Sequence, residues 1–321
     1  MPDAHPDQLH RDHACGHGHA HGHAHALTGG RLDRAMAIGV GLNAAFVVAE
    51  LAAGFFAGSL ALLADAGHNA SDVLGLLLAW GANWLARRPP TDRYTWGFRR
   101  STIYAALANA VLLLTACGAI LWEAIHRLRA PEPVAGPTVI AVAAIGVAIN
   151  TITALLFMRG QQDANVRGAF LHMAADAAIS AGVVVAGILM LLTGQAWIDP
   201  LVSIAITLAI VAGTWGLFRE SVDLALDAVP RGVETGAITK ALGEIAGVSA
   251  VHDLHVWGAS TSETSLTVHL VIPDTAAHEA ALAAAKKLLH DRFRIDHTTI
   301  QIERECVTFA PRGGRSPRAC S

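Results

Sequence analysis

Six stretches of about 20 or more mostly apolar residues run through the first two thirds of the chain. They lie at about 35–57, 60–85, 102–125, 137–158, 168–193 and 199–218. An α-helix needs about 20 such residues to cross a bilayer, because its backbone polar groups must be bonded within the helix there. Charged residues make up only 15% of the chain, against about 25% in soluble domains. The sequence therefore predicts an α-helical membrane protein with six transmembrane helices.

Arginine gathers at one end of these predicted helices. The connection RRPPTDRYTWGFRR (87–100) is rich in it, and further arginines lie before the first helix, between the fourth and fifth, and after the sixth. The connections on the other side carry almost none, and only Arg127 and Arg129 oppose the trend. Because positive loops face the cytoplasm, both termini are predicted to be cytoplasmic.

Two histidine–aspartate pairs lie inside the apolar stretches. His68 and Asp72 are four residues apart, and so are His172 and Asp176. Residues at this spacing share one helix face, and ionisable groups inside membrane helices are costly and usually functional. If the two helices face each other, two imidazoles and two carboxylates can close a tetrahedral site that suits Zn²⁺. One pair alone could be an interhelical hydrogen-bond clamp, but the repeated spacing favours a metal site.

Two further carboxyl groups, Glu50 and Asp65, also lie within the apolar stretches. Asp65 precedes His68 by one helical turn, so it is a candidate for orienting an imidazole or for relaying protons. The residues alone leave the roles of both carboxyl groups open.

The first 30 residues are predicted to be a disordered, histidine-rich cytoplasmic tail. The tract HACGHGHAHGHAHA includes His17, His19, His21, His23 and His25. It has neither the apolar run nor the basic start of a signal peptide. Such density of imidazole favours loose binding of divalent metals, with a plain polar tail as the alternative.

After the transmembrane domain of 31–222, the composition becomes that of a soluble domain. Residues 234–248 and 278–293 have the pattern of amphipathic helices, and 251–260, 263–273 and 298–305 that of strands. The order α-β-β-α-β over 223–306 predicts a small cytoplasmic α+β domain of the ferredoxin-like kind. Residues 307–321 are predicted to be a disordered tail.

The motifs HNASD and HMAAD, together with SLALLADAGH, RRPPTDRYTWGFRR and HDLHVW, resemble the cation diffusion facilitator family over about residues 30–306. The resemblance is greatest to bacterial zinc exporters. It implies a homodimer in the inner membrane that exchanges cytoplasmic Zn²⁺ for protons. It assigns His68, Asp72, His172 and Asp176 to the transport site, and histidine at position 68 is typical of zinc-preferring members.

The resemblance also implies metal ligands in the cytoplasmic domain. The candidates are His252, His269, Glu303, His255 and His278. Gln301 stands where some members have histidine, which puts full occupancy in doubt. Some members carry a further site in the loop after the second helix, but TDRYTWGFRR has no histidine, so that site is expected to be missing.

These observations predict a secondary transporter rather than an enzyme. There is no HExxH motif and no Walker A sequence, and the formal net charge of −3 gives no general attraction to nucleic acid. The predicted function is efflux of zinc, with cobalt, cadmium or nickel as further cargo, by metal/proton antiport across the bilayer. Zn²⁺ is the expected cargo and regulatory ligand. The alternative is a membrane metal sensor or storage protein that does not transport.

Overall fold

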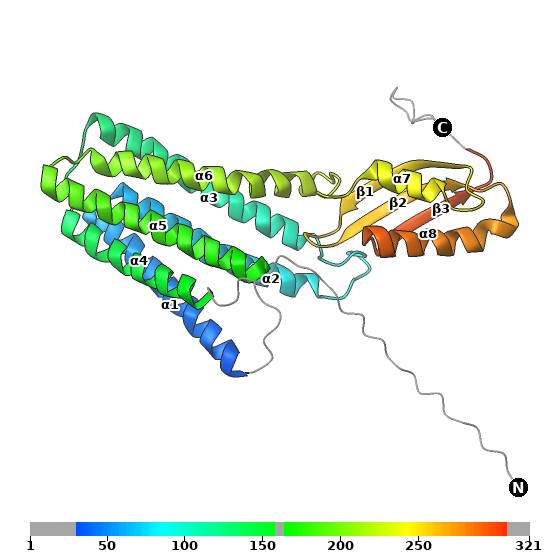
Figure 1. Ribbon diagram of the computed structural model, residues 1–321, viewed down its shortest axis with the longest axis horizontal. Coiled ribbons are helices and arrows are strands. Elements are labelled where there is room, and N and C mark those ends of the chain that lie inside the picture. The colour runs from blue at the N-terminus through cyan, green and yellow to red at the C-terminus, as the bar shows by residue number, and fades with distance from the viewer. Residues whose placement is uncertain (1–29, 158–163, 307–321) are drawn as a thin grey trace, which may run out of the picture.

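The computed structural model describes residues 30–157 and 164–306, which form a body of long helices and a smaller α/β domain (Figure 1). The long helices are α1 (Gly30–Ala57), α2 (Leu60–Ala86), α3 (Ser101–Arg129), α4 (Gly136–Phe157), α5 (Ala164–Thr193) and α6 (Ile198–Ala225). Each contains one of the predicted apolar stretches almost completely. The tail histidines His17, His19, His21, His23 and His25 lie outside the described residues, as do residues 307–321.

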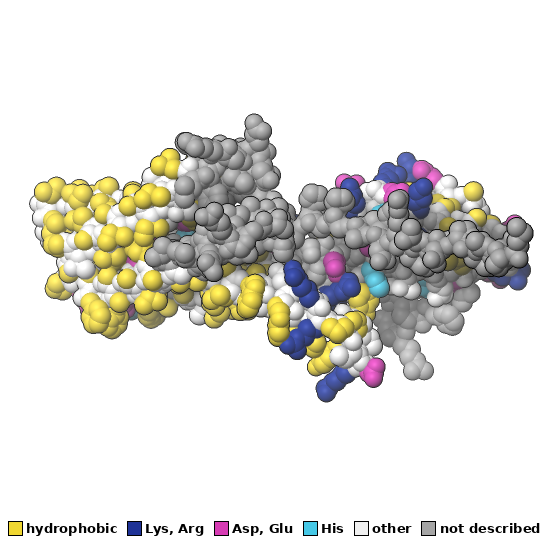
Figure 2. Space-filling model, turned by 90° about the horizontal axis from the view of Figure 1, so that it is seen from below, with side chains coloured by type: hydrophobic (Ala, Val, Ile, Leu, Met, Phe, Trp, Pro, Cys, Tyr) yellow, Lys and Arg dark blue, Asp and Glu magenta, His cyan; other side chains and the backbone are white. Residues whose placement is uncertain are grey.

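Four segments are long and apolar enough to cross a membrane: Ser101–Arg129, Gly136–Leu155, Phe170–Thr193 and Ile198–Ala225. In α1 a shorter apolar segment, Ala44–Ala57, was found among the described residues. Helix α2 carries Asp65, His68 and Asp72, which lower its hydropathy. Figure 2 shows hydrophobic side chains over the visible face of the helical body and Lys and Arg near the smaller domain. The predicted helical membrane domain is thus confirmed with four clear spans.

Within the helical body, α4 packs along α5, and α3 packs along α6, with α2 against α3. Small residues let these helices approach closely, as is common in membranes. At Gly187 on α5, a Cβ would lie 2.6 Å from Cγ1 of Ile140 on α4. At this point the α4–α5 contact therefore requires glycine.

The start of α2 is fastened to the start of α6. The Ser59 hydroxyl donates to Asp199 Oδ1 at 2.5 Å, and the Leu60 backbone N–H donates to Asp199 Oδ2 at 2.7 Å. Ser59 Oγ also accepts from the Leu62 backbone N–H, which makes it the N-cap of α2. These bonds fix where α2 begins, and so fix the height at which its later polar side chains lie.

The smaller domain contains α7 (Thr235–Gly243), β1 (Ala250–Gly258), β2 (Thr264–Val271), the 3₁₀ turn η2 (Thr275–Ala277), α8 (His278–Phe293) and β3 (His297–Glu303). Its described sheet has the order β1-β2-β3, with β1 antiparallel and β3 parallel to β2. Leu266, Val268 and Leu270 of β2 are buried with Leu242 of α7 and Leu289 of α8. The helices therefore cover one face of the sheet, and the predicted order of elements is confirmed.

The connection at 87–100, between α2 and α3, contacts the smaller domain. Arg99 pairs with Glu263 at 2.7 Å, and Arg100 pairs with Asp227 at 2.5 Å. The rings of Trp96 and His297 lie 4.3 Å apart between centroids. The arginines that predicted the cytoplasmic side of the membrane therefore also hold the smaller domain.

Candidate metal centre

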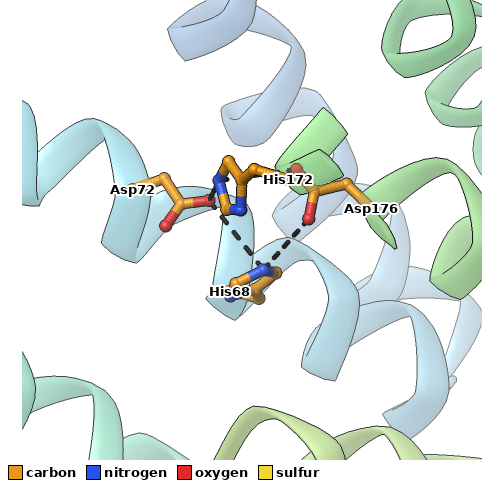
Figure 3. A group of neighbouring side chains, drawn as sticks. All are labelled: His68, Asp72, His172 and Asp176. Atoms are coloured by element: carbon orange, nitrogen blue, oxygen red, sulfur yellow. Dashed lines mark hydrogen bonds and ion pairs between the residues drawn. The ribbon is translucent and has the colours of Figure 1, made fainter. Parts of the chain in front are cut away.

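Helices α2 and α5 bring together the four residues predicted from the HxxxD spacing. His68 and Asp72 project from α2 and His172 and Asp176 from α5, toward a common point (Figure 3). Each offers one ligand atom, and these atoms all lie within 4.8 Å of one another. The assumption that the two helices face each other therefore holds.

Each imidazole contacts the carboxylate of the opposite helix. His68 Nε2 lies 3.2 Å from Asp176 Oδ1, and His172 Nε2 lies 3.1 Å from Asp72 Oδ2. Within each helix the imidazole–carboxylate distances are 3.9 Å on α2 and 3.6 Å on α5. Ligands about 2.1 Å from one tetrahedral ion lie about 3.4 Å from each other. The spacing of the four groups therefore fits one such ion with small adjustments.

The site is closed at one end and open at the other. The side chain of Asp176 is 2% exposed and that of His68 16%, whereas Asp72 is 32% and His172 44% exposed. Asp72 lies toward the end of α2 that leads into the connection 87–100. The open side of the site therefore faces the smaller domain.

The remaining predicted carboxyl groups lie deeper in the helical body. Asp65 and Glu50 are both fully buried. The Ser180 hydroxyl donates to Asp65 Oδ2 at 2.6 Å, and the Asn69 amide donates to Glu50 Oε2 at 3.1 Å. Asp65 thus bonds to a serine of α5 and not to an imidazole of the site, so the idea that it orients one of these rings gains no support.

A second group of ligand-type side chains lies on the sheet face that α7 and α8 leave open. It consists of His252, His269 and Glu303. His252 of β1 pairs with His269 of β2, and Glu303 of β3 lies in register with Val271 of β2. The Glu303 carboxylate reaches both imidazoles, with Oε2 3.0 Å from His252 Nε2 and Oε1 3.0 Å from His269 Nδ1. Antiparallel and parallel pairing together thus assemble this cluster from three strands.

A β-bulge adds Asp253 and His255 to the edge of this cluster. The register shifts between His252 and His255, and Asp253 has a φ of 52°. Residues three apart in a regular strand point to opposite faces, but the extra residue of a bulge returns His255 to the face of His252. Asp253 Oδ1 lies 3.1 Å from His255 Nε2, and its Oδ2 lies 3.6 Å from His269 Nε2. Sequence reasoning missed Asp253, because HDLHVW has the pattern of an unbroken strand.

Two further predicted positions play other parts. His278 begins α8, and its Nε2 donates to the Ile272 carbonyl at 2.9 Å, apart from the cluster. Gln301 lies beside His269 in the register, and its amide donates to Glu303 Oε1 at 2.7 Å. Gln301 therefore holds the glutamate that contacts both histidines.

Comparison with known families covers both parts of the chain. Residues 36–224 match the cation efflux transmembrane domain, and residues 230–305 match the cation efflux protein cytoplasmic domain. The two matches meet close to the end of α6, where the helical body gives way to the smaller domain.

Named relatives match along most of the chain. The zinc transporter ZitB of Shigella flexneri is 37% identical over 266 residues, covering 82% of this chain and 85% of the relative. The cation efflux system protein CzcD of Alcaligenes sp. (strain CT14) is 36% identical, covering 84% and 86%. A cadmium, cobalt and zinc/H(+)-K(+) antiporter of Bacillus subtilis (strain 168) is 31% identical, covering 81% and 85%. A solved structure, the metal-bound C-terminal domain of the CzcD transporter from Cuprividus metallidurans, is 40% identical; it covers 22% of this chain and 99% of that chain, with a TM-score of 0.21.

Proposed function

The chain belongs to the cation efflux family, the cation diffusion facilitators, and from this premise we propose that it exports Zn²⁺ from the cytoplasm in exchange for protons. Its relatives are named as transporters and antiporters, so it is a transport protein and not an enzyme. The observation that carries the proposal is the meeting of His68, Asp72, His172 and Asp176 inside the helical body.

The chemistry of these four groups couples metal to protons. Imidazole and carboxylate bind metal only when deprotonated, so proton and Zn²⁺ compete for the same atoms. Imidazole changes its charge near physiological pH, which lets a modest proton gradient displace the metal. Because two ligands come from α2 and two from α5, a shift of one helix against the other changes the site's affinity. Access from the cytoplasm through the side of Asp72 and His172 fits metal loading in the state described here.

The donor set also bears on the range of metals. Two imidazoles and two carboxylates suit Zn²⁺, and similar ligands accept Co²⁺, Cd²⁺ or Ni²⁺. The Bacillus subtilis relative is named for cadmium, cobalt and zinc. We therefore assign zinc as the main cargo, with these ions as weaker competitors.

The finer architecture is part of the same proposal. We assign membrane crossings to all six long helices, both termini to the cytoplasm and the chain to a bacterial inner membrane. The smaller domain is assigned a ferredoxin-like fold. The family that it matches is named for dimerisation, which supports a homodimer. Zinc at His252, His269 and Glu303 would act as a regulatory ligand, with His255 and His278 as further candidates. The tail histidines at 17–25 would collect metal.

The test is zinc uptake into proteoliposomes with and without a pH gradient. In wild type, an outward flow of protons is expected to drive zinc into the vesicles. Asp176→Ala is expected to lose this uptake, because Asp176 is the most buried of the four ligands. Asp92→Ala is the matched control, since Asp92 is an exposed aspartate in the connection 87–100. Uptake by Asp176→Ala equal to wild type would contradict the site. Zinc binding without uptake in wild type would favour the sensor or storage function instead.

A further inference from the structure

Glu50 on α1 and Asp65 on α2 form a pair of carboxyl groups in the interior of the helical body. Both side chains are fully buried, and the two carboxyl groups are close enough for the charge of one to act on the other. Their positions are set from separate helices, because Ser180 of α5 bonds to Asp65 and Asn69 of α2 bonds to Glu50. None of these bonds involves the four groups of the transport site.

Two oxygens of this pair lack a donor. Ser180 serves Asp65 Oδ2 and Asn69 serves Glu50 Oε2, which leaves Asp65 Oδ1 and Glu50 Oε1 buried without a hydrogen bond. A buried polar atom without a partner is costly, and two adjacent buried carboxylates repel each other strongly. One proton shared by the pair lowers both costs, because it removes one of the two negative charges and supplies the pair with a donor.

The ion pairs of Arg99, Arg100, Arg127 and Arg231 lie elsewhere in the described part of the chain, so none of these basic groups balances the charge of the pair. Helix α4, which packs against α1 and α5, has no ionisable side chain between Gly136 and Phe157. The titratable groups that act on Asp65 through space, besides Glu50, are His68 on α2 and Asp176 on α5.

We propose that Glu50 and Asp65 together bind one exchangeable proton, at a site separate from the metal ligands, and release it when metal binds. The release follows from position, since Asp65 precedes His68 by three residues on α2 and Ser180 follows Asp176 by four on α5. A divalent cation one helical turn away favours loss of a proton from the pair. By reciprocity, a proton on the pair weakens metal binding by the same factor.

This inference deepens the proposed antiport, on which its role in transport rests. Protons that compete directly for His68, Asp72, His172 and Asp176 would be supplemented by one that never touches the metal. Asp65 lies nearer than His68 to the start of α2, which is the end of this helix farther from the smaller domain. The proton site is therefore on the closed side of the transport site.

The test measures the zinc ratio that a pH gradient of one unit sustains across proteoliposomes held at zero membrane potential. Each proton exchanged per zinc changes this ratio about tenfold, because one pH unit corresponds to a tenfold change in the equilibrium. Glu50→Gln and Asp65→Asn keep the size and polarity of the side chains but remove the shared acidic proton. Both are expected to sustain a ratio about tenfold lower than wild type.

Asp223→Asn is the control, because Asp223 is an exposed carboxylate at the end of α6 that touches neither the pair nor the four transport-site groups. Its ratio is expected to equal that of wild type. An unchanged ratio in both Glu50→Gln and Asp65→Asn overturns the proposal.

A second measurement applies where a variant does not transport. Zinc is added to the purified full-length protein in weak buffer, and the protons released are counted. Other zinc sites contribute equally to wild type and variant, so the difference isolates the pair. About one proton fewer in Glu50→Gln supports the proposal, and equal release overturns it. If zinc transport by the wild type does not depend on the pH gradient, the proposed antiport is wrong. The number of protons released on zinc binding still tests the role of the Glu50–Asp65 pair.

Discussion

At the residue scale, we expect the identity of the group at position 68 to govern which metals the proposed transport site accepts. His68 supplies one of two nitrogens in a set otherwise made of carboxylate oxygens. Imidazole suits zinc, whereas carboxylate suits harder ions such as Mn²⁺. The nitrogen of His68 is therefore expected to contribute to metal selectivity as well as to metal affinity.

Replacing His68 by Asp is expected to lower zinc affinity and to broaden the range of metals, because the site then has one nitrogen and three carboxylates. The measurement is inhibition of zinc uptake by Co²⁺, Cd²⁺ and Mn²⁺ in proteoliposomes. His126→Asp, at an exposed histidine near the end of α3, is the control and should keep wild-type competition. Unchanged competition in His68→Asp would argue against this role.

Asp253 combines a backbone role and a side-chain role that can be separated. Its φ of 52° is unfavourable for most residues and worst for β-branched ones. Asp253→Gly should keep the fold and weaken zinc binding to the cytoplasmic cluster. Asp253→Val should in addition lower the free energy of unfolding of the domain by about 1–3 kcal/mol. Zinc titration and thermal unfolding of both full-length variants provide the measurement, and equal stability would refute the backbone role.

At the element scale, the contact between α4 and α5 depends on the absence of a side chain at Gly187. Helix α5 carries two of the four groups of the proposed transport site. The way α5 packs against α4 therefore affects where His172 and Asp176 lie. A second glycine of the same helix, Gly182, has nothing within 4 Å of a Cβ built there. The two glycines therefore separate the effect of packing from that of helix propensity.

Gly187→Ala is expected to lower the thermal stability of the detergent-solubilised protein, because the new methyl group would lie 2.6 Å from Ile140. Gly182→Ala should leave stability unchanged or raise it by up to about 1 kcal/mol, since alanine favours the helix. Melting curves of the two variants and wild type decide between them. Equal melting temperatures for the two alanine variants would show that Ile140 on α4 can move aside without loss of stability.

Sequence reasoning succeeded where a simple period carries the information. The spacing of His68 and Asp72 fixes a common helix face, and the same holds on α5, so only the meeting of the two helices had to be assumed. The partners of Asp65 and Glu50 were out of reach, because Ser180 and a neighbouring carboxyl on another helix leave no pattern along the chain. The predicted crossing of the membrane by α2 is not among the four clear spans, because Asp65, His68 and Asp72 lower the hydropathy of this helix.

The strands show a similar limit. The pattern of residues 263–273 predicted β2 correctly, and the structure buries Leu266, Val268 and Leu270 at its alternate positions. The bulge in β1 breaks alternation at Asp253, whose type gives only a weak hint of positive φ. The family resemblance had named His252, His269 and Glu303 as candidate ligands, but the contacts of Asp253 with His255 and His269 came only from the three-dimensional register.

At the scale of the whole molecule, a few polar contacts connect the helical body to the smaller domain. The Arg100–Asp227 pair is about half exposed on each side, so it contributes at most about 1 kcal/mol to stability. The Thr261 backbone N–H donates to the Thr102 hydroxyl at 3.2 Å beside it. Such contacts are weak enough to break and form again during a transport cycle.

Arg100→Glu is expected to loosen this contact, because it places two acidic groups together. Hydrogen exchange of the turn at 259–263 should quicken, since the Thr261 amide loses its partner. The exchanged pair Arg100→Glu with Asp227→Arg should restore slow exchange, while amides of α8 stay unchanged in all variants. Fast exchange that persists in the double variant would show that charge pairing is not what holds the turn.

The unequal exposure of the four ligands has a consequence for how an ion sheds its water. Asp72 and His172 stand at the open side, whereas His68 and Asp176 are covered. A hydrated ion that enters there meets one carboxylate and one imidazole while it still keeps part of its own shell. Dehydration is therefore divided into two smaller steps, and the last waters leave only when the covered pair replaces them.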